Sequence, residues 1–241
     1  MIETVNFISG SGTTNFAVLE TEKSGGILDG LVKTVAIISS DPEAPAIERA
    51  KDAGFDKKKI FTVDPTKELA SQLLPILDKY HPDFFVQLGW FPRTPDEVIK
   101  KYKGVNQHLG PGGKWMYGLR RIHTHMKFCE MIKEQRPIPI FSHLITPEKS
   151  NYDEGDVLYV RWEKLLKNES PEQAQARLAP IEHAVQIEAL RRLALGDYKL
   201  QSSPIIARTA KEEEQLLKAK TEAKDKYPPN KKLLYLPAST E

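Results

Sequence analysis

The chain has 241 residues, of which 40% are hydrophobic and 28% are charged, a balance typical of a globular protein with a sizeable core. Its 35 Lys and Arg residues offset 33 Asp and Glu residues, so the net charge of +2 indicates neither a nucleic acid nor a membrane as partner. The N-terminus lacks a signal-peptide pattern, and no apolar run approaches the ~18 residues of a membrane helix. We therefore expect a cytoplasmic protein.

The single cysteine, Cys129, excludes an internal disulfide and a cysteine-based zinc site. Its helical, apolar surroundings favour a buried packing residue. The nearby His123 and His125 are separated by one residue. On a helix such side chains point in different directions, so this pair does not match the usual metal-binding spacing, and we expect no metal.

Near the N-terminus, a short strand at residues 5–8 leads through a glycine-rich turn into a helix at residues 16–22. Glycines allow the backbone to approach an anion closely, and the free N–H groups at a helix start can hold a phosphate. A tight turn without a ligand is an equal alternative, because the turn lacks the Gly-Lys-Ser/Thr of a triphosphate loop. The residues of this turn are Gly10, Ser11, Gly12, Thr13, Thr14 and Asn15.

Further strands, at residues 34–39, 60–63 and 84–88, alternate with helices at residues 43–53 and 67–80. This alternation predicts an α/β fold with a doubly wound, mostly parallel sheet and helices on both faces. The ligand crevice of such a sheet lies at the carboxyl ends of its strands. We therefore expect the glycine-rich turn and the loop after residue 88 to lie near one another.

The next strand, at residues 104–108, ends in polar residues and breaks into glycines. Asn106 and His108 share one face of this strand, because successive side chains point to opposite faces. An amide donor beside a titratable base suits a reaction in which charge grows on a carbonyl oxygen while a proton moves. The alternative is structural, with polar residues that cap the following turn.

The second half of the chain begins with a helix over about residues 117–134. Strands at residues 139–145 and 157–162 then form a hairpin with an acidic tip. The strongest helical pattern covers residues 171–195, and Pro180 inside it predicts a kink or two consecutive helices. Residues 211–226 form a charge-dense helix that we expect to be exposed. We divide the chain into an α/β domain, residues 1–210, and a charged C-terminal tail, residues 211–241.

Six motifs in this order resemble the folate-dependent formyltransferases over about residues 4–200. The motifs are Ile8-Ser9-Gly10-Ser11-Gly12-Thr13-Thr14-Asn15, Gly104-Val105-Asn106-Gln107-His108, Ile122-His123-Thr124-His125, Phe141-Ser142-His143, Asp153-Glu154-Gly155 and Glu182-His183-Ala184. The resemblance implies a Rossmann-like variant of the doubly wound fold. It also implies transfer of a formyl group from 10-formyltetrahydrofolate, the cosubstrate, to the amine of a phosphorylated acceptor. In purine biosynthesis that acceptor is glycinamide ribonucleotide.

The resemblance also assigns roles to residues. It implies that Asn106, His108 and Asp153 are catalytic, with the neighbouring Asp156 as an alternative to Asp153. It implies that the turn at residues 10–15 and Glu182 bind the acceptor. It places the folate pocket at Phe91, Pro92, Arg93 and His143.

The chain departs from the family pattern after His108. The usual Pro-Ser-Leu-Leu-Pro is replaced by a longer loop, Leu109-Gly110-Pro111-Gly112-Gly113-Lys114-Trp115. Because such loops shape substrate access, the acceptor could instead be an amino sugar nucleotide or water. A non-catalytic relative that binds folate or a nucleotide is a further alternative. A homodimer is possible.

Overall fold

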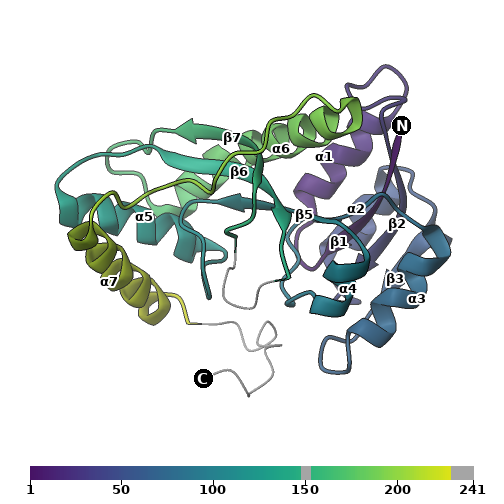
Figure 1. Cartoon of the computed structure of the whole chain (residues 1–241), viewed down its shortest axis with the longest axis horizontal. Helices are drawn as coiled ribbons and strands as arrows, with labels where there is room; N and C mark the ends of the chain where they lie inside the picture. The colour runs from purple at the N-terminus through teal and green to yellow at the C-terminus, as the bar shows by residue number, and fades with distance from the viewer. Residues whose placement is uncertain (148–152, 229–241) are drawn as a thin grey trace.

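The computed structural model describes residues 1–147 and 153–228, which form one mixed sheet with helices packed on it (Figure 1). The order of the seven strands across the sheet is β3-β2-β1-β4-β5-β6-β7. Their bounds are β1 Ile2–Ile8, β2 Val32–Ser39, β3 Ile60–Thr62, β4 Phe84–Gln87, β5 Gly104–Leu109, β6 Ile138–Ile145 and β7 Val157–Glu163. Strands β1 to β5 pair in parallel, whereas β6 and β7 pair antiparallel. The predicted doubly wound, mostly parallel sheet and its terminal hairpin are confirmed.

Helices cover both faces of the sheet because the apolar side chains of its inner strands point both ways. Val5 and Phe7 of β1 pack in a cluster with Leu73 and Leu77 of a helix on one face. Ile8 of the same strand packs in a cluster on the other face. The helices are α1 Thr13–Glu22, α2 Pro45–Asp52, α3 Ala70–Tyr80, α4 Asp96–Lys101, α5 Leu119–Ile132, α6 Pro171–Leu195 and α7 Ala210–Lys226, with a short 3-10 helix, η1, at Lys57–Lys59. None of the described helices is long and apolar enough to cross a membrane.

The parallel pairing brings together the segments that follow β1, β4 and β5. The register places Phe7 of β1 opposite Gln87 of β4, and Gln87 opposite Asn106 of β5. The turn after Ile8, the loop after Gln87 and the end of β5 therefore open on the same edge of the sheet. This edge carries the candidate site.

Helix α6 is continuous from Pro171 to Leu195, so the prediction of two consecutive helices at Pro180 is wrong. A capping box between Ser170 and Gln173 begins the helix, and Gly196 in a left-handed conformation ends it. Its buried side chains join the clusters beneath the sheet. Tertiary packing thus holds the helix together across a proline that removes one backbone donor.

Helix α7 is exposed along most of its surface, as its charge density indicates, but one of its faces is buried. It packs along α5, and its residues Ala219 and Ala223 are fully buried. Arg136 makes two hydrogen bonds to the carboxylate of Glu212 at the beginning of α7. The alanines lie one helical turn apart, which creates a narrow apolar strip within a charged helix.

Candidate functional site

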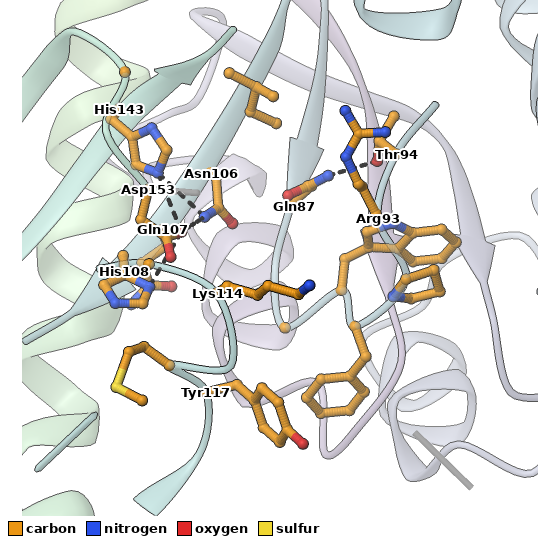
Figure 2. A pocket seen from close by; sticks show the side chains of 18 of the residues that line it. Gln87, Arg93, Thr94, Asn106, Gln107, His108, Lys114, Tyr117, His143 and Asp153 are labelled. Atoms are coloured by element: carbon orange, nitrogen blue, oxygen red, sulfur yellow. Dashed lines mark hydrogen bonds and ion pairs between the residues drawn. The ribbon is translucent and has the colours of Figure 1, made fainter. Parts of the chain in front are cut away.

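Asp153 is the centre of a cluster of polar side chains from β5, β6 and the acidic turn (Figure 2). Its Oδ1 accepts a hydrogen bond from Asn106 Nδ2 at 2.9 Å and lies 3.2 Å from His108 Nδ1. The Nε2 of His143 lies 3.6 Å from the same oxygen and 3.2 Å from Asn106 Nδ2. The structure therefore brings together all three residues expected to be catalytic, and it adds His143 from the predicted folate set.

Each of the two imidazoles contacts partners with both ring nitrogens. His108 faces the carboxylate of Asp153 with Nδ1 and the carbonyl oxygen of Pro111 with Nε2, at 3.0 Å. Both partners are acceptors, which fits an imidazolium that donates from both nitrogens. His143 directs Nδ1 at the carbonyl oxygen of Leu144, and its Nε2 lies beside both Asn106 Nδ2 and Asp153 Oδ1.

The charge on Asp153 is stabilised by these neighbours. Burial raises the pKa of its carboxyl, but the positive charges and hydrogen bonds of His108 and His143 outweigh burial, so the pKa lies well below its usual range. Asp153 remains ionised while it pairs with His108. Asp156, the alternative carboxylate, has an exposed side chain, and its backbone oxygen accepts from Leu144.

Local backbone geometry explains how the cluster forms. Antiparallel pairing sets Asn106 of β5 directly opposite His143 of β6, so both side chains project on one face of the sheet. Asp153 has a left-handed φ of 60°, a conformation that aspartate tolerates better than most residues. At Gly155 a side chain would lie 1.7 Å from the backbone oxygen of Leu144, so only glycine allows the acidic turn to approach β6.

The cluster lines one side of a cavity of ≈260 Å³. Phe91, Pro92 and Arg93 line another side, as expected of the folate pocket, together with Trp90. Arg93 pairs with Asp96 at the start of α4. The third side is the segment at residues 113–118, which includes Lys114, Trp115 and Tyr117. These aromatic walls suit a flat heterocycle.

Two residues that line the cavity, Trp90 and Tyr117, each carry a polar atom that has no hydrogen-bond partner among the described residues. Both atoms, Trp90 Nε1 and Tyr117 Oη, are buried within the protein.

The glycine-rich turn lies beside the cavity rather than in its wall. Gly10 contacts the ring of Phe91, which would lie 3.5 Å from an added Cβ. Gly12 has φ 70° and precedes α1 without a side-chain cap, so the first N–H groups of the helix are available to an anion. Asn15 is fully buried and its Oδ1 accepts from Asn6, so its side chain supports the turn from the interior.

Glu182 lies in α6, between the glycine-rich turn at residues 10–15 and the cavity. It lies 3.6 Å from Arg121, which lines the cavity. Burial raises the pKa of the Glu182 carboxyl, while Arg121 and His108 act in the opposite direction. The adjacent His183 lies 3.2 Å from the hydroxyl of Thr13 in the turn. Helix α6 therefore contacts both the predicted anion site and the wall of the cavity.

Sequence reasoning did not identify Arg121, Trp115 or Tyr117 as site residues. Their signal is indirect: Trp115 ends the loop that departs from the family pattern, Tyr117 follows it, and Arg121 lies in the first turn of α5. Within residues 1–147 and 153–228, no group of three His, Cys, Asp or Glu side chains is arranged to hold a metal ion. His125 is instead fully buried, with Nε2 directed at the backbone oxygen of Arg136.

Comparison with protein families gives a match to the family described as formyl transferase over residues 2–190. Two curated relatives are each named phosphoribosylglycinamide formyltransferase, chloroplastic. The relative from Arabidopsis thaliana is 27% identical over 196 residues, 76% of this chain and 62% of that protein. The relative from Vigna unguiculata is 25% identical over 199 residues, 78% of this chain and 59% of that protein. The chain thus spans about three fifths of the length of both.

Solved structures are similar in fold. Glycinamide ribonucleotide transformylase 1 from Symbiobacterium toebii has a TM-score of 0.65 at 22% identity, and the match covers 85% of this chain and 95% of that one. Phosphoribosylglycinamide formyltransferase from Anaplasma phagocytophilum has a TM-score of 0.64 at 16% identity, with 84% and 95% covered. At these identities the likeness concerns the arrangement of strands and helices.

Proposed function

Because this chain belongs to the formyl transferase family, we propose that it transfers a formyl group from 10-formyltetrahydrofolate to the primary amine of glycinamide ribonucleotide. The observation that carries the proposal is the convergence of Asn106, His108 and Asp153 beside an aromatic cavity. The names of the curated relatives support the choice of acceptor.

The reaction forms a bond between the acceptor nitrogen and the formyl carbon and breaks the bond from that carbon to the folate nitrogen. The acceptor amine loses a proton and the folate nitrogen gains one. Negative charge grows on the formyl oxygen, so the amide of Asn106 and the imidazolium of His108 are placed to stabilise it. Asp153 orients the imidazole of His108, and it can take up the amine proton through water.

The structure adds one requirement to this scheme. The Nε2 of His108 donates to the Pro111 carbonyl, and Asn106 Nδ2 donates to Asp153. For His108 to donate to the formyl oxygen, that oxygen must replace the Pro111 carbonyl as acceptor. The bound donor must therefore displace or rotate part of the loop that follows His108.

We assign acceptor binding to the turn at residues 10–15 and to Glu182. The N-terminus of α1 offers N–H groups to a phosphate, and Gly12 keeps the backbone accessible there. A hydrogen bond between His183 of α6 and Thr13 of this turn shows that the helix and the turn are in contact. Glu182 can then orient an amine, and the positive charge of Arg121 offsets the cost of burying the Glu182 carboxylate.

A second candidate keeps the folate donor and changes the acceptor, because the wall at residues 113–118 is built from the loop that departs from the family pattern. An acceptor screen separates the two candidates. Purified full-length protein is mixed with 10-formyltetrahydrofolate and, separately, with glycinamide ribonucleotide, an amino sugar nucleotide or no amine. Tetrahydrofolate release only with glycinamide ribonucleotide is the expected result. Equal release without an amine would identify a hydrolase, and no release in any mixture would identify a non-catalytic relative.

We also propose a cytoplasmic location for this protein. The names of both curated relatives state a chloroplast location for those proteins. Fluorescence microscopy of the tagged full-length chain in its own cells tests this proposal, and an organellar signal would refute it.

A further inference from the structure

Helix α7 lies outside the family match, which ends at residue 190. It runs antiparallel to α5, as Figure 1 shows, and its contacts follow α5 from end to end. The pairs are Glu212 with Arg136, Gln215 with the Met131 carbonyl, Glu222 with His123, and the Tyr227 carbonyl with Arg120. This series of contacts fixes the register of α7, so the side chains on its inner face have defined positions.

One of these inner side chains reaches the candidate site. Lys220 is half-buried, and its Nζ donates to the backbone oxygen of Gly112 at 2.7 Å. An added Cβ at Gly113 would lie 3.0 Å from the same Nζ, so the glycine makes room for the lysine. The residue before Gly112 is Pro111, whose carbonyl accepts from His108 Nε2. Lys220 of α7 and His108 therefore bind the carbonyl oxygens of two consecutive loop residues, Gly112 and Pro111.

The charge of Lys220 also suits this position. Burial lowers the pKa of its ammonium, and the carboxylates of Glu154 and Asp153 act in the opposite direction. The ammonium therefore lies within electrostatic reach of the acidic turn that supplies the centre of the cluster. A second lysine, Lys224, lies over the ring of Trp115, 5.9 Å from its centroid.

We propose that Lys220 is a positioning residue for the active site: through the backbone oxygen of Gly112 it holds the adjoining segment at residues 113–118 in place as a wall of the cavity. This inference rests on the proposed function. Lys220 acts through the backbone of the loop and touches neither substrate. Its loss should therefore affect the binding of the donor, which shares the cavity with that loop, more than the rate of transfer.

The test compares Lys220→Met with Lys218→Met. Lys218 lies in the same helix, is exposed and pairs with Glu214 at 2.7 Å, so its replacement controls for the loss of a lysine from α7. Amide hydrogen exchange is measured for residues 110–118, with residues 32–39 of the central sheet as internal reference. KM for 10-formyltetrahydrofolate and kcat are measured at saturating acceptor. Lys220→Arg tests rescue.

In Lys220→Met, we expect exchange at residues 110–118 to accelerate roughly tenfold relative to the sheet, as expected for loss of one charge-assisted hydrogen bond. KM for the donor should rise roughly tenfold with a smaller change in kcat, and Lys220→Arg should restore most of both. Equal behaviour of Lys220→Met and Lys218→Met would overturn the inference, as would equal acceleration in the loop and the sheet. If the wild-type protein transfers no formyl group, the proposed function fails, while the exchange comparison still decides whether Lys220 holds the loop.

Discussion

The side-chain amide of Asn106 donates to the carboxylate of Asp153 at 2.9 Å, across a sequence separation of 47 residues. The same carboxylate oxygen lies 3.2 Å from His108 Nδ1. One ionised oxygen therefore orients both groups that are placed to stabilise a growing negative charge. If formyl transfer depends on this arrangement, removing the charge of Asp153 should affect the rate and leave the fold intact.

Asp153→Asn should reduce kcat by at least ~100-fold, the usual contribution of a positioned acid or base. Asparagine preserves the size of the side chain and tolerates the left-handed backbone at this position. The matched control is Asp156→Asn in the same turn, where the side chain is exposed. Steady-state rates of tetrahydrofolate release measure both. A larger loss for the Asp156 variant would exchange the roles of the two carboxylates.

Gly12→Ala should weaken acceptor binding. The added Cβ would lie 2.4 Å from the Cβ of Ala46, so the turn must shift away from α2. Gly30→Ala is the control, because Gly30 has a similar left-handed φ of 67° and open space around it. We expect KM for the phosphorylated acceptor to rise roughly tenfold only in Gly12→Ala, consistent with the loss of a phosphate contact. An unchanged KM would show that the turn binds no phosphate.

Glu182→Gln should raise KM for the acceptor and leave KM for the folate donor unchanged. The substitution keeps the shape of the side chain and removes the charge that faces Arg121. Glu188→Gln in the same helix is the control, because Glu188 pairs with Arg191 and Arg192. If Glu182→Gln and Glu188→Gln changed KM for the acceptor and KM for the donor to the same extent, Glu182 would have a structural role only.

Glu22 should make the stability of the protein depend on pH. Burial raises the pKa of this carboxyl to about 7, although Thr34 donates to both of its oxygens. Between the unfolded pKa of 4.5 and the folded pKa, the folded protein binds the extra proton, so stability falls as the pH rises through this window. The loss should reach about 3 kcal/mol at most.

Urea unfolding between pH 4.5 and pH 8 checks this expectation. Glu22→Gln should remove most of the decrease. Glu20→Gln, in which a 40% exposed carboxylate paired with Lys23 is replaced, should retain it. The same pH dependence in all three proteins would rule out Glu22 as its source.

Much of the fold follows from local patterns. The apolar strands at residues 34–39 and 84–88 alternate with helices, which leaves a parallel sheet with covered faces as the natural arrangement. Helix α4 was missed because its six residues are too short for periodicity to reveal, although acidic residues begin it and lysines end it. The alternative of two consecutive helices at Pro180 is wrong because tertiary packing outweighs the loss of one hydrogen bond.

The candidate site was predictable where its residues share a strand and not where they meet through tertiary contacts. Asn106 and His108 follow from the alternation of one strand, whereas His143 was expected only from the family resemblance and meets Asn106 through the pairing of β5 with β6. The position of Lys220 depends on how α7 docks on α5, which is determined by contacts such as that of Glu212 with Arg136. The apolar residues Leu216, Ala219 and Ala223 pack on the buried face of this charged helix, and they are too few to predict that face from the sequence.

The most direct test of the proposed function follows the formyl carbon itself. The full-length protein is incubated with 10-formyltetrahydrofolate labelled in the formyl carbon and with glycinamide ribonucleotide, and the products are separated. We predict that the label appears in the formylated amine in a one-to-one ratio with released tetrahydrofolate. Label recovered as formate, or retained in the donor while a known formyltransferase reacts under the same conditions, would contradict the account.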